Sequence, residues 1–320
     1  MGDMMKIRLG YVAITNTVDN LTTSGLVTYT HYKKLGSRRG REKLLKISLS
    51  NIVALEAVIS YNLRNNIHFY RLTSRLIPLA THPLVSFDYS KYFKKELRQI
   101  GQLINKHHMR VDSHPDQFCI LNSTNEAVVT SSIIILKYHQ NMFKIMNLHH
   151  PKIIIHIGSS SGGKRASLKR FTEAFNTLDE KLKKMIIVEN DDKVYNIRNT
   201  LSLCHKLDIP MVLDYHHYKC CNNGEKIEDY IESIFATWDK EALPPKIHFA
   251  SPRSKKNKRA HHDFINSDDF IRFIEKIKFV NRDFDIMIEA KMKDIALFKL
   301  VRELKYKTNY RFLDETTFEV

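Results

Sequence analysis

The chain has 320 residues, of which 43% are hydrophobic, and this is enough apolar material for one large core. Its 51 Lys and Arg outnumber its 35 Asp and Glu, so the formal net charge is +16, which favours a polyanionic partner over a neutral metabolite. Charge alone does not decide between them, because a lysine-rich surface also keeps a protein in solution.

The cysteines and the first residues of the chain indicate in which cellular compartment the protein is expected. The four cysteines have no CxxC spacing, so they fit neither a disulfide framework nor a zinc ribbon. The stretch MGDMMKIRLGYVAI lacks an apolar core long enough for a signal peptide, and no segment approaches the length of a membrane span. We therefore expect a reducing location, cytoplasmic or nucleoid-associated, with no membrane partner.

Eight apolar runs rich in Ile, Val, Leu and Met are typical of parallel strands that are buried on both faces. In chain order they are 7–14, 66–72, 109–114, 152–157, 185–189, 210–215, 246–250 and 285–290. Segments with helical spacing lie between them, for example 48–66, 92–108 and 128–147. No Pro/Gly/Ser-rich spacer divides the chain, so we expect one domain over 1–320.

Alternating strand and helix segments predict an α/β fold, and eight repeats predict a (β/α)₈ TIM barrel. The alternative is a doubly wound open sheet. That fold normally carries a glycine-rich phosphate loop after its first strand, and the segment GYVAITNTVDN has no GxGxxG. The barrel is therefore the preferred architecture.

Polar side chains follow the predicted strands where each strand ends, which is where such sheets bind ligands. These residues, together with further histidines and acids of the same loops, are His82, His114, His156, Glu189, Asp214, His217, His248, His261 and Glu289. One ion needs four to six donors, so nine candidates suit two or three ions. Imidazole and carboxylate donors without thiolate favour Mn²⁺, Zn²⁺, Fe²⁺ or Co²⁺.

At this point seven segments in chain order resemble the UV damage endonuclease (UVDE) family. They are HFYRLTSRLIPLATH (68–82), SHPDQF (113–118), HIGSSSGGK (156–164), VENDD (188–192), LDYHH (213–217), KIHFASPR (246–253) and IEAKMKD (288–294). The resemblance implies a TIM barrel similar to that of endonuclease IV. It also implies three divalent ions, usually Mn²⁺, with Zn²⁺, Co²⁺ or Mg²⁺ as alternatives, in a groove that binds DNA.

The resemblance also implies roles for individual residues. The metal ligands would be His114, His156, Glu189, Asp214, His217, His248, His261 and Glu289. His82 would be a further active-site histidine and Glu189 a bridging, catalytic carboxylate. Lys246 matches a lysine that can be carboxylated in this family; the alternative is a plain lysine that contacts the scissile phosphate.

Two positions depart from the family pattern, and neither is a predicted ligand. Ser159 stands where the motif often reads glycine, and Phe118 stands where some relatives have tyrosine. Phenylalanine lacks the phenolic hydroxyl but keeps an aromatic face that can stack on unstacked bases. The alternative for Phe118 is ordinary core packing.

The resemblance implies a metal-dependent nick in duplex DNA immediately 5′ of ultraviolet photoproducts, which include cyclobutane dimers and 6-4 photoproducts, with other distorting lesions as further substrates. The expected chemistry is attack of an activated water on phosphorus. Gln117 and Phe118 would probe the lesion, supported by Tyr11 and Asn20, because a damaged pair costs less to extrude than an intact one. The expected phosphate contacts are Arg71, Lys164 and the run 251–259, which includes Arg253. A second basic segment lies at 33–46.

We expect the chain to work as a monomer. Three alternative functions remain at this point. An apurinic-site nuclease similar to endonuclease IV would share the metal architecture and prefer an abasic site. A metal-dependent sugar isomerase would have no use for the +16 charge or for Gln117 and Phe118. A catalytically silent DNA-damage binding protein would lack a metal ligand, and none of the eight is missing.

Overall fold

A computed structural model describes residues 4–12, 14–18, 21–116 and 118–320. Eight parallel strands match the eight predicted runs, each shortened by a few residues at its ends. They are β1 (Lys6–Tyr11), β2 (Phe69–Leu72), β3 (Arg110–Ser113), β4 (Lys152–His156), β5 (Ile186–Glu189), β6 (Met211–Asp214), β7 (Lys246–Phe249) and β8 (Phe284–Ile288). The predicted barrel strands are confirmed.

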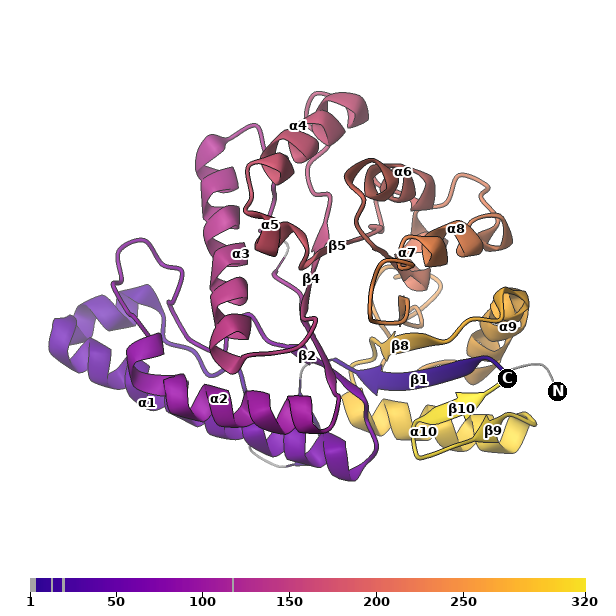
Figure 1. The fold of residues 1–320 in the computed structure, drawn as a ribbon, viewed down its shortest axis with the longest axis horizontal. Coiled ribbons are helices and arrows are strands. Elements are labelled where there is room, and N and C mark those ends of the chain that lie inside the picture. The colour runs from indigo at the N-terminus through magenta and orange to yellow at the C-terminus, as the bar shows by residue number, and fades with distance from the viewer. Residues whose placement is uncertain (1–3, 13, 19–20, 117) are drawn as a thin grey trace.

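Helices return the chain from the carboxyl end of each strand to the amino end of the next, and they surround the sheet (Figure 1). They are α1 (Tyr29–Arg64), α2 (Ser90–Lys106), α3 (Glu126–Met146), α4 (Lys164–Asn176), α5 (Glu180–Lys183), α6 (Ile197–Leu207), α7 (Tyr215–Cys220), α8 (Ile231–Ala236), α9 (Ser267–Ile277) and α10 (Lys293–Lys307). Two short 3₁₀ turns lie at Ile227–Asp229 and Lys278–Val280.

The sheet differs from the predicted barrel along one seam. Its strand order is β2-β3-β4-β5-β6-β7-β8-β1-β10-β9, and no hydrogen-bonded ladder joins β1 to β2 in the described part of the chain. A C-terminal hairpin of β9 (Arg311–Phe312) and β10 (Thr317–Glu319), which the sequence did not predict, pairs antiparallel with β1 instead. The two strands still touch, because a Cβ on Gly10 would come within 2.5 Å of the Phe69 ring.

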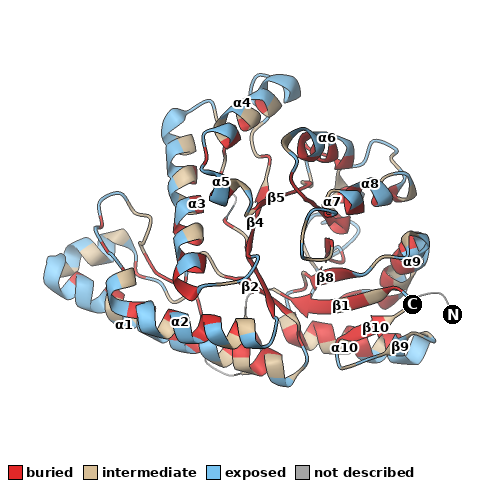
Figure 2. Ribbon diagram, viewed as in Figure 1, coloured by how far each residue is buried: buried red, intermediate tan, exposed pale blue. Residues whose placement is uncertain are grey.

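The strands are packed by apolar side chains on both of their faces. Ile154, Ile187 and Val212 form an inner apolar cluster with the fully buried Trp238, whose Nε1 donates to the Met211 carbonyl at 2.7 Å. The opposite faces of the same strands pack against the helices, and Figure 2 shows the strands buried along their length. This two-sided burial explains why the strands read as continuous apolar runs.

Below the carboxyl ends, five charged side chains form a buried ion-pair layer, in which four are buried and Arg8 is partly exposed. Asp285 accepts from Arg8 Nε at 2.6 Å and from Arg110 Nη1 at 2.8 Å, and Asp112 is paired with Lys246. The Arg110 guanidinium also lies 5.0 Å from the centre of the Trp238 ring. Charges this deep are tolerated because each has an opposite partner.

Helix α1 is longer than the predicted segment 48–66 and begins at Tyr29. By length and composition it is the one described helix that could cross a membrane, contrary to the expectation that no segment approaches a span. Half of its apolar stretch is buried against the rest of the protein. Packing of α1 on the core therefore accounts for the composition.

Candidate metal centre

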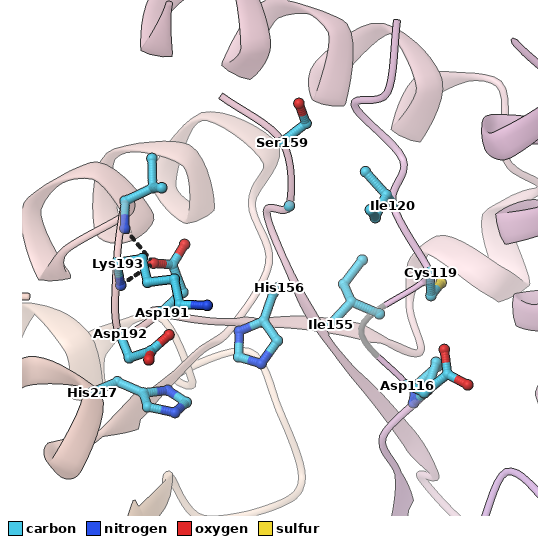
Figure 3. A pocket seen from close by; sticks show the side chains of 13 residues that line it. Asp116, Cys119, Ile120, Ile155, His156, Ser159, Asp191, Asp192, Lys193 and His217 are labelled. Atoms are coloured by element: carbon cyan, nitrogen blue, oxygen red, sulfur yellow. Dashed lines mark hydrogen bonds between the residues drawn. The ribbon is translucent and has the colours of Figure 1, made fainter. Parts of the chain in front are cut away.

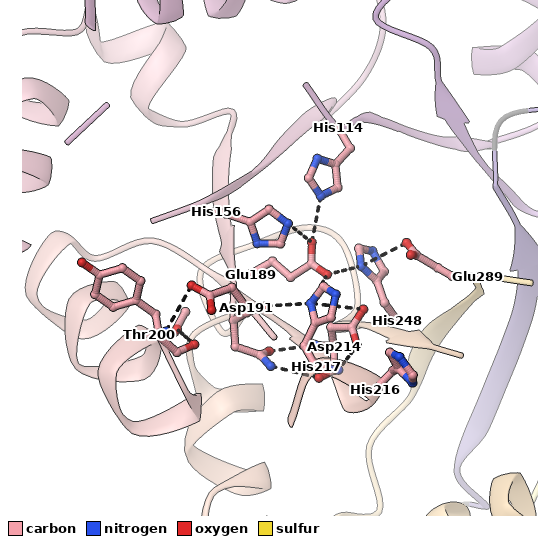
Figure 4. A network of polar contacts seen from close by, with 12 residues as sticks. His114, His156, Glu189, Asp191, Thr200, Asp214, His216, His217, His248 and Glu289 are labelled. Atoms are coloured by element: carbon pink, nitrogen blue, oxygen red, sulfur yellow. Dashed lines mark hydrogen bonds and ion pairs between the residues drawn. The ribbon is translucent and has the colours of Figure 1, made fainter. Parts of the chain in front are cut away.

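The strand ends bring the predicted metal ligands to one place, the carboxyl end of the barrel (Figure 4). His156, Glu189 and Asp214 are the last residues of β4, β5 and β6, and His114 and Glu289 directly follow β3 and β8. His248 lies in β7, His217 in α7, and His261 in the loop after β7. The strand register places His156 beside Glu189 and Asp214 beside His248.

Glu189 is the centre of this cluster and is 1% exposed. Its Oε2 lies 2.9 Å from His114 Nε2 and 3.8 Å from His156 Nε2. Its Oε1 lies 2.9 Å from His248 Nδ1 and 3.5 Å from His217 Nδ1. One carboxylate therefore faces four imidazoles, with two of them on each oxygen.

Glu289 organises the other side of the cluster. Its Oε1 lies 2.7 Å from Arg71 Nη1 and 3.5 Å from His248 Nδ1, and its Oε2 lies 3.9 Å from His261 Nδ1. Arg71 Nη2 also lies 2.8 Å from His248 Nε2. Arg71 was expected to hold a phosphate; the structure instead places it in a buried ion pair with a predicted metal ligand.

Asn190 fixes the position of Asp214. The Asn190 side chain accepts from the Asp214 backbone N–H at 2.9 Å and donates to the Asp214 carbonyl at 2.9 Å, so it joins the ends of β5 and β6. Asp214 in turn caps α7, because its Oδ1 accepts from the His217 backbone N–H at 2.7 Å. This cap turns the His217 ring towards Glu189.

The arrangement fits divalent metal ions. His114 Nδ1 lies 2.9 Å from the Pro115 carbonyl, and His217 Nδ1 lies 3.0 Å from the Asn190 carbonyl, which is how ligating histidines are commonly oriented. Asp214 Oδ2 and His156 Nδ1 are buried and have no hydrogen-bond partner among the described residues. Two triads could each hold an ion, His114–His156–Glu189 and Glu189–Asp214–His217, and Glu189 is common to both.

Burial and neighbouring charges shift the pKa values of the cluster in opposite directions. Burial opposes ionisation of Glu189, but His248, His156 and a hydrogen bond from His114 hold its pKa well below the usual value. Burial raises the pKa of Asp214 well above its usual range. For His217, burial favours the neutral form, yet the carboxylates of Asp214 and Glu189 raise its pKa to about 9.

These shifts predict that metal binding depends on pH. In the metal-free protein His217 holds a proton up to a pKa of about 9, and a ligand nitrogen must lose its proton before it binds a metal. The affinity for Mn²⁺ should therefore rise with pH up to about 9, by about tenfold per unit for each proton released. Isothermal titration calorimetry in two buffers of different ionisation enthalpy measures that proton number.

A matched variant separates this effect from a general one. His205→Gln removes an exposed histidine of α6 and should leave the proton number unchanged. His217→Gln should lower both the affinity and the number of protons released. An affinity for Mn²⁺ that stays constant between pH 6 and pH 9 would contradict the assignment of His217 as a ligand.

Two predicted site residues lie deeper in the protein than the sequence analysis assumed. Lys246 is buried and paired with Asp112, and its Nζ lies 4.9 Å from the centre of the Phe69 ring. Burial lowers the pKa of Lys246 to about 8. Tyr11 is 1% exposed and donates to Asn62 Oδ1 at 2.7 Å, so it is a core residue that presents no surface to DNA.

Of the two residues predicted to probe the lesion, the structure describes Phe118 but not Gln117. Phe118 is 68% exposed, so ordinary core packing does not explain it. Its backbone N–H donates to Asp116 Oδ1 at 3.0 Å, which shapes the loop after β3. Gln117 and Asn20 lie outside the described residues.

The remaining predicted residues lie around the cluster rather than in it. His82 stacks on Tyr29 with ring centres 4.2 Å apart, and its Nδ1 accepts from the Leu84 backbone N–H at 3.2 Å. Lys164 Nζ donates to Asn199 at 2.9 Å on the exposed rim. Arg253 is exposed, and its backbone N–H donates to the Ala260 carbonyl at 2.7 Å, so the basic run forms a narrow loop that returns at His261.

A pocket opens beside the cluster, between the loops that follow β3, β4 and β5 (Figure 3). His156 and His217 belong to both the pocket and the cluster. Ile120 and Ile155 give it an apolar wall, and Asp191 lies on the opposite side.

Three residues of the site were missed in the sequence. Asn190 has no charge and gave no signal apart from its position after Glu189. His216 is buried, with Nε2 3.2 Å from the Arg259 carbonyl, and it was hidden by its neighbour His217. Asp112 lies two residues before His114 on the same face of β3, and strand alternation could have identified it as inward-facing.

Comparisons with known proteins agree with this geometry. The family model for UV-endonuclease UvdE matches residues 7–316. A UV DNA damage endonuclease of Bacillus mycoides strain KBAB4 is 37% identical over 316 residues, covering 98% of this chain and all of the relative. The range that the family model matches includes every predicted ligand position.

Solved structures give the same result. The crystal structure of SacUVDE superimposes with a TM-score of 0.85 at 33% identity, covering 94% of this chain and 98% of the other. Endonuclease IV from Thermus thermophilus has a TM-score of 0.56 at 11% identity, covering 79% and 95%, which shows a shared barrel fold. The chain is thus a member of the UV-endonuclease UvdE family.

Proposed function

We propose that this protein nicks duplex DNA immediately 5′ of ultraviolet photoproducts, and that it uses divalent metal ions bound by the cluster around Glu189. The observation that carries the proposal is the convergence of five imidazoles and three carboxylates at one barrel end, next to an exposed aromatic side chain. The excess of 16 positive charges supports a polyanionic substrate.

The proposed ligands are His114, His156, Glu189, Asp214, His217, His248, His261 and Glu289. Manganese is the expected metal, with three ions in the full site, and Zn²⁺, Co²⁺ or Mg²⁺ are alternatives that metal analysis of the purified protein would separate. Bound there, such ions would supply Lewis acidity, lower the pKa of water and stabilise charge on the leaving oxygen.

The residues of the chain hold this chemistry in place. Glu189 presents one oxygen to each half of the cluster, so it would bridge two ions. Arg71 neutralises Glu289 and keeps the charge on that side of the cluster low. The Pro115 carbonyl holds His114 Nδ1, so that His114 Nε2 faces Glu189. The Asn190 carbonyl holds His217 Nδ1 and so fixes the His217 ring beside Glu189 and Asp214. In-line attack of water would leave a 3′-hydroxyl and a 5′-phosphate.

Lesion recognition would use Phe118 and the neighbouring pocket. A dipyrimidine photoproduct stacks and pairs poorly, so it costs less to extrude than an intact pair. The exposed Phe118 ring could fill the space that the damaged bases leave. The pocket lined by Ile120, Ile155 and His156 could then receive the extruded bases.

Substitution of Phe118 by alanine tests this role. Phe118→Ala should reduce the preference for damaged over intact duplex by about tenfold, because one base–aromatic contact contributes about 1–3 kcal/mol. The measurement compares equilibrium binding to matched duplexes with and without a cyclobutane dimer. Tyr306→Ala removes another exposed aromatic side chain, far along the chain on α10, and serves as the control. An unchanged preference in Phe118→Ala would show that the ring does not probe DNA.

The proposed activity is tested on three duplexes of one sequence, which carry a pyrimidine dimer, an abasic site or no damage. The metal-loaded protein should nick the dimer-containing strand at the bond 5′ of the lesion. Preference for the abasic duplex would instead indicate an apurinic-site nuclease. Failure to nick any of the three would reject the nuclease proposal. The expected working form is a monomer in the cytoplasm or nucleoid.

A further inference from the structure

We propose that residues 29–46, the first half of α1, form a basic arm that binds the DNA backbone several base pairs away from the nicked bond. The arm holds seven cations and one acid: Lys33, Lys34, Arg38, Arg39, Arg41, Lys43, Lys46 and Glu42. Its net charge is therefore +6, more than a third of the +16 of the chain, in 18 of 320 residues. This inference rests on the proposed function, because it extends the same DNA surface.

The cations of the arm are directed to solvent and are almost free of acidic partners. All seven are exposed. Among the described residues only Arg38 has an acidic partner, Glu42, at 3.4 Å. Some lysines on other helices of the protein are paired along the helix, as in Lys169–Glu173 and Lys299–Glu303. Unpaired cations at this density repel one another, and a polyanion would relieve that repulsion.

The topology puts the arm at the same end of the barrel as the metal centre. Helix α1 ends at Arg64, shortly before β2 begins at Phe69, so its last turns lie at the amino end of the sheet. Its first turns must then lie at the carboxyl end. Tyr29, the first residue of the helix, confirms this by stacking on His82 in the loop that follows β2.

The arm extends beyond the body of the protein. Gly40 and Leu44 are the first buried residues of α1, and no residue of 29–39 is buried. A kink at Gly36 divides this part of α1. At about 1.5 Å per residue, the continuous segment 37–43 forms about 10 Å of helix, the length of about three base pairs of DNA. Figures 1 and 2 show this exposed end of α1 at the left edge of the molecule.

The arm has a defined shape, which a disordered basic tail would lack. Gly36 has φ 77°, a left-handed conformation that divides the helix into two segments. Tyr32 folds back over the following segment, because a Cβ on Gly40 would come within 2.7 Å of the Tyr32 ring. Thr28 caps the first turn by accepting from the His31 backbone N–H at 3.2 Å. The cations are thus presented at fixed positions.

The test compares two triple-lysine variants. Lys33, Lys34 and Lys43 are exposed arm lysines that have no acidic partner among the residues the structure describes. Lys106, Lys144 and Lys181 are exposed lysines near the ends of helices that precede strands, at the amino end of the barrel. Each set is changed to glutamine, which preserves helix propensity and removes three charges. The folds are compared by circular dichroism and thermal unfolding.

Equilibrium binding to an undamaged duplex of about 40 base pairs is measured as the salt concentration is varied. The arm variant should bind about tenfold or more weakly near physiological salt. The slope of log affinity against log salt should fall by up to about 2.7, since each phosphate contact contributes about 0.9. The control variant should match the unmodified protein in both. Equal losses in the two variants, or no loss in either, would overturn the proposal.

Nicking tests the position of the arm. Duplexes of about 40 base pairs are prepared with the dimer at the centre, near one end or near the other end. The arm variant should nick the central substrate more slowly than the unmodified protein and should equal it on the substrate that lacks DNA on the arm side. A defect of the same size on all three would refute a distant contact. If the unmodified protein nicks none of them, the proposed function fails, while the binding comparison still tests the arm.

Discussion

Replacement of Glu189 by glutamine should abolish nicking of ultraviolet-irradiated plasmid and leave DNA binding nearly unchanged. Glutamine keeps the size of the side chain but removes the negative charge that both halves of the cluster share. Loss of a bridging carboxylate should slow the reaction by at least about a thousandfold, which corresponds to about 4 kcal/mol of barrier. Conversion of supercoiled to relaxed plasmid measures the rate.

A control variant shows whether a loss of nicking comes from the metal site or from a disturbed fold. Glu173→Gln makes the same chemical change at an exposed position of α4, and its rate should equal that of the unmodified protein. Metal content should fall in Glu189→Gln and stay constant in the control. Normal nicking by Glu189→Gln would reject the cluster as the catalytic centre.

Removal of metal by a chelator should also abolish nicking, and Mn²⁺ should restore it. The reason is that Asp214 Oδ2 and His156 Nδ1 are buried and have no hydrogen-bond partner in the described part of the chain, so both atoms are available to bind an ion. Binding to the folded state alone stabilises it, by about 2.7 kcal/mol when free metal is about a hundred times the dissociation constant. The melting temperature of the chelated protein should therefore rise as Mn²⁺ is added back.

This second readout does not depend on activity. In Asp214→Asn the added metal should raise the melting temperature less, because one ligand is lost. In Asp268→Asn, which changes an exposed aspartate of α9, the rise should equal that of the unmodified protein. Full nicking in the presence of excess chelator would contradict a metal mechanism.

Much of the fold and of the ligand set could be predicted from the sequence, because both depend on local pattern. Strands buried on both faces leave long apolar runs, and each run ended in a residue such as His156, Glu189 or Asp214. Parallel strands end at one edge, so residues far apart in the sequence could be grouped without knowing the fold in detail. The ends of the strands were placed within a few residues for the same reason.

The depth of a side chain inside the barrel could not be predicted in this way. Lys246 and His248 alternate correctly on β7 and both face inward, but strand alternation does not tell which level each one reaches. Lys246 pairs with Asp112 one level below the ligands. The burial of Arg71 and Tyr11 was not predicted for the same reason, since the end of a strand can be covered by its neighbours.

The pairing of strands that lie far apart in the sequence could not be predicted either. The C-terminal hairpin consists of strands of two and three residues, which are too short to leave a pattern. It takes the edge of β1 that a closed barrel would have offered to β2. The extra length of α1 was concealed because its first half buries almost no side chain and so lacks an apolar stripe.

The buried ion-pair layer bears on any attempt to transplant this centre into another protein. Arg8, Arg110 and Lys246 give three positive charges against the two negative charges of Asp112 and Asp285, directly beneath three carboxylate ligands. Arg71 interacts with both the ligands and the layer below them. Burial opposes its charge, but the carboxylates of Glu289 and Asp112 raise the pKa of Arg71 above its usual value. A designer who grafted the eight ligands onto a barrel with an apolar floor would omit this counter-charge. The grafted acids would then be harder to ionise, and the copied site would bind metal more weakly than the original.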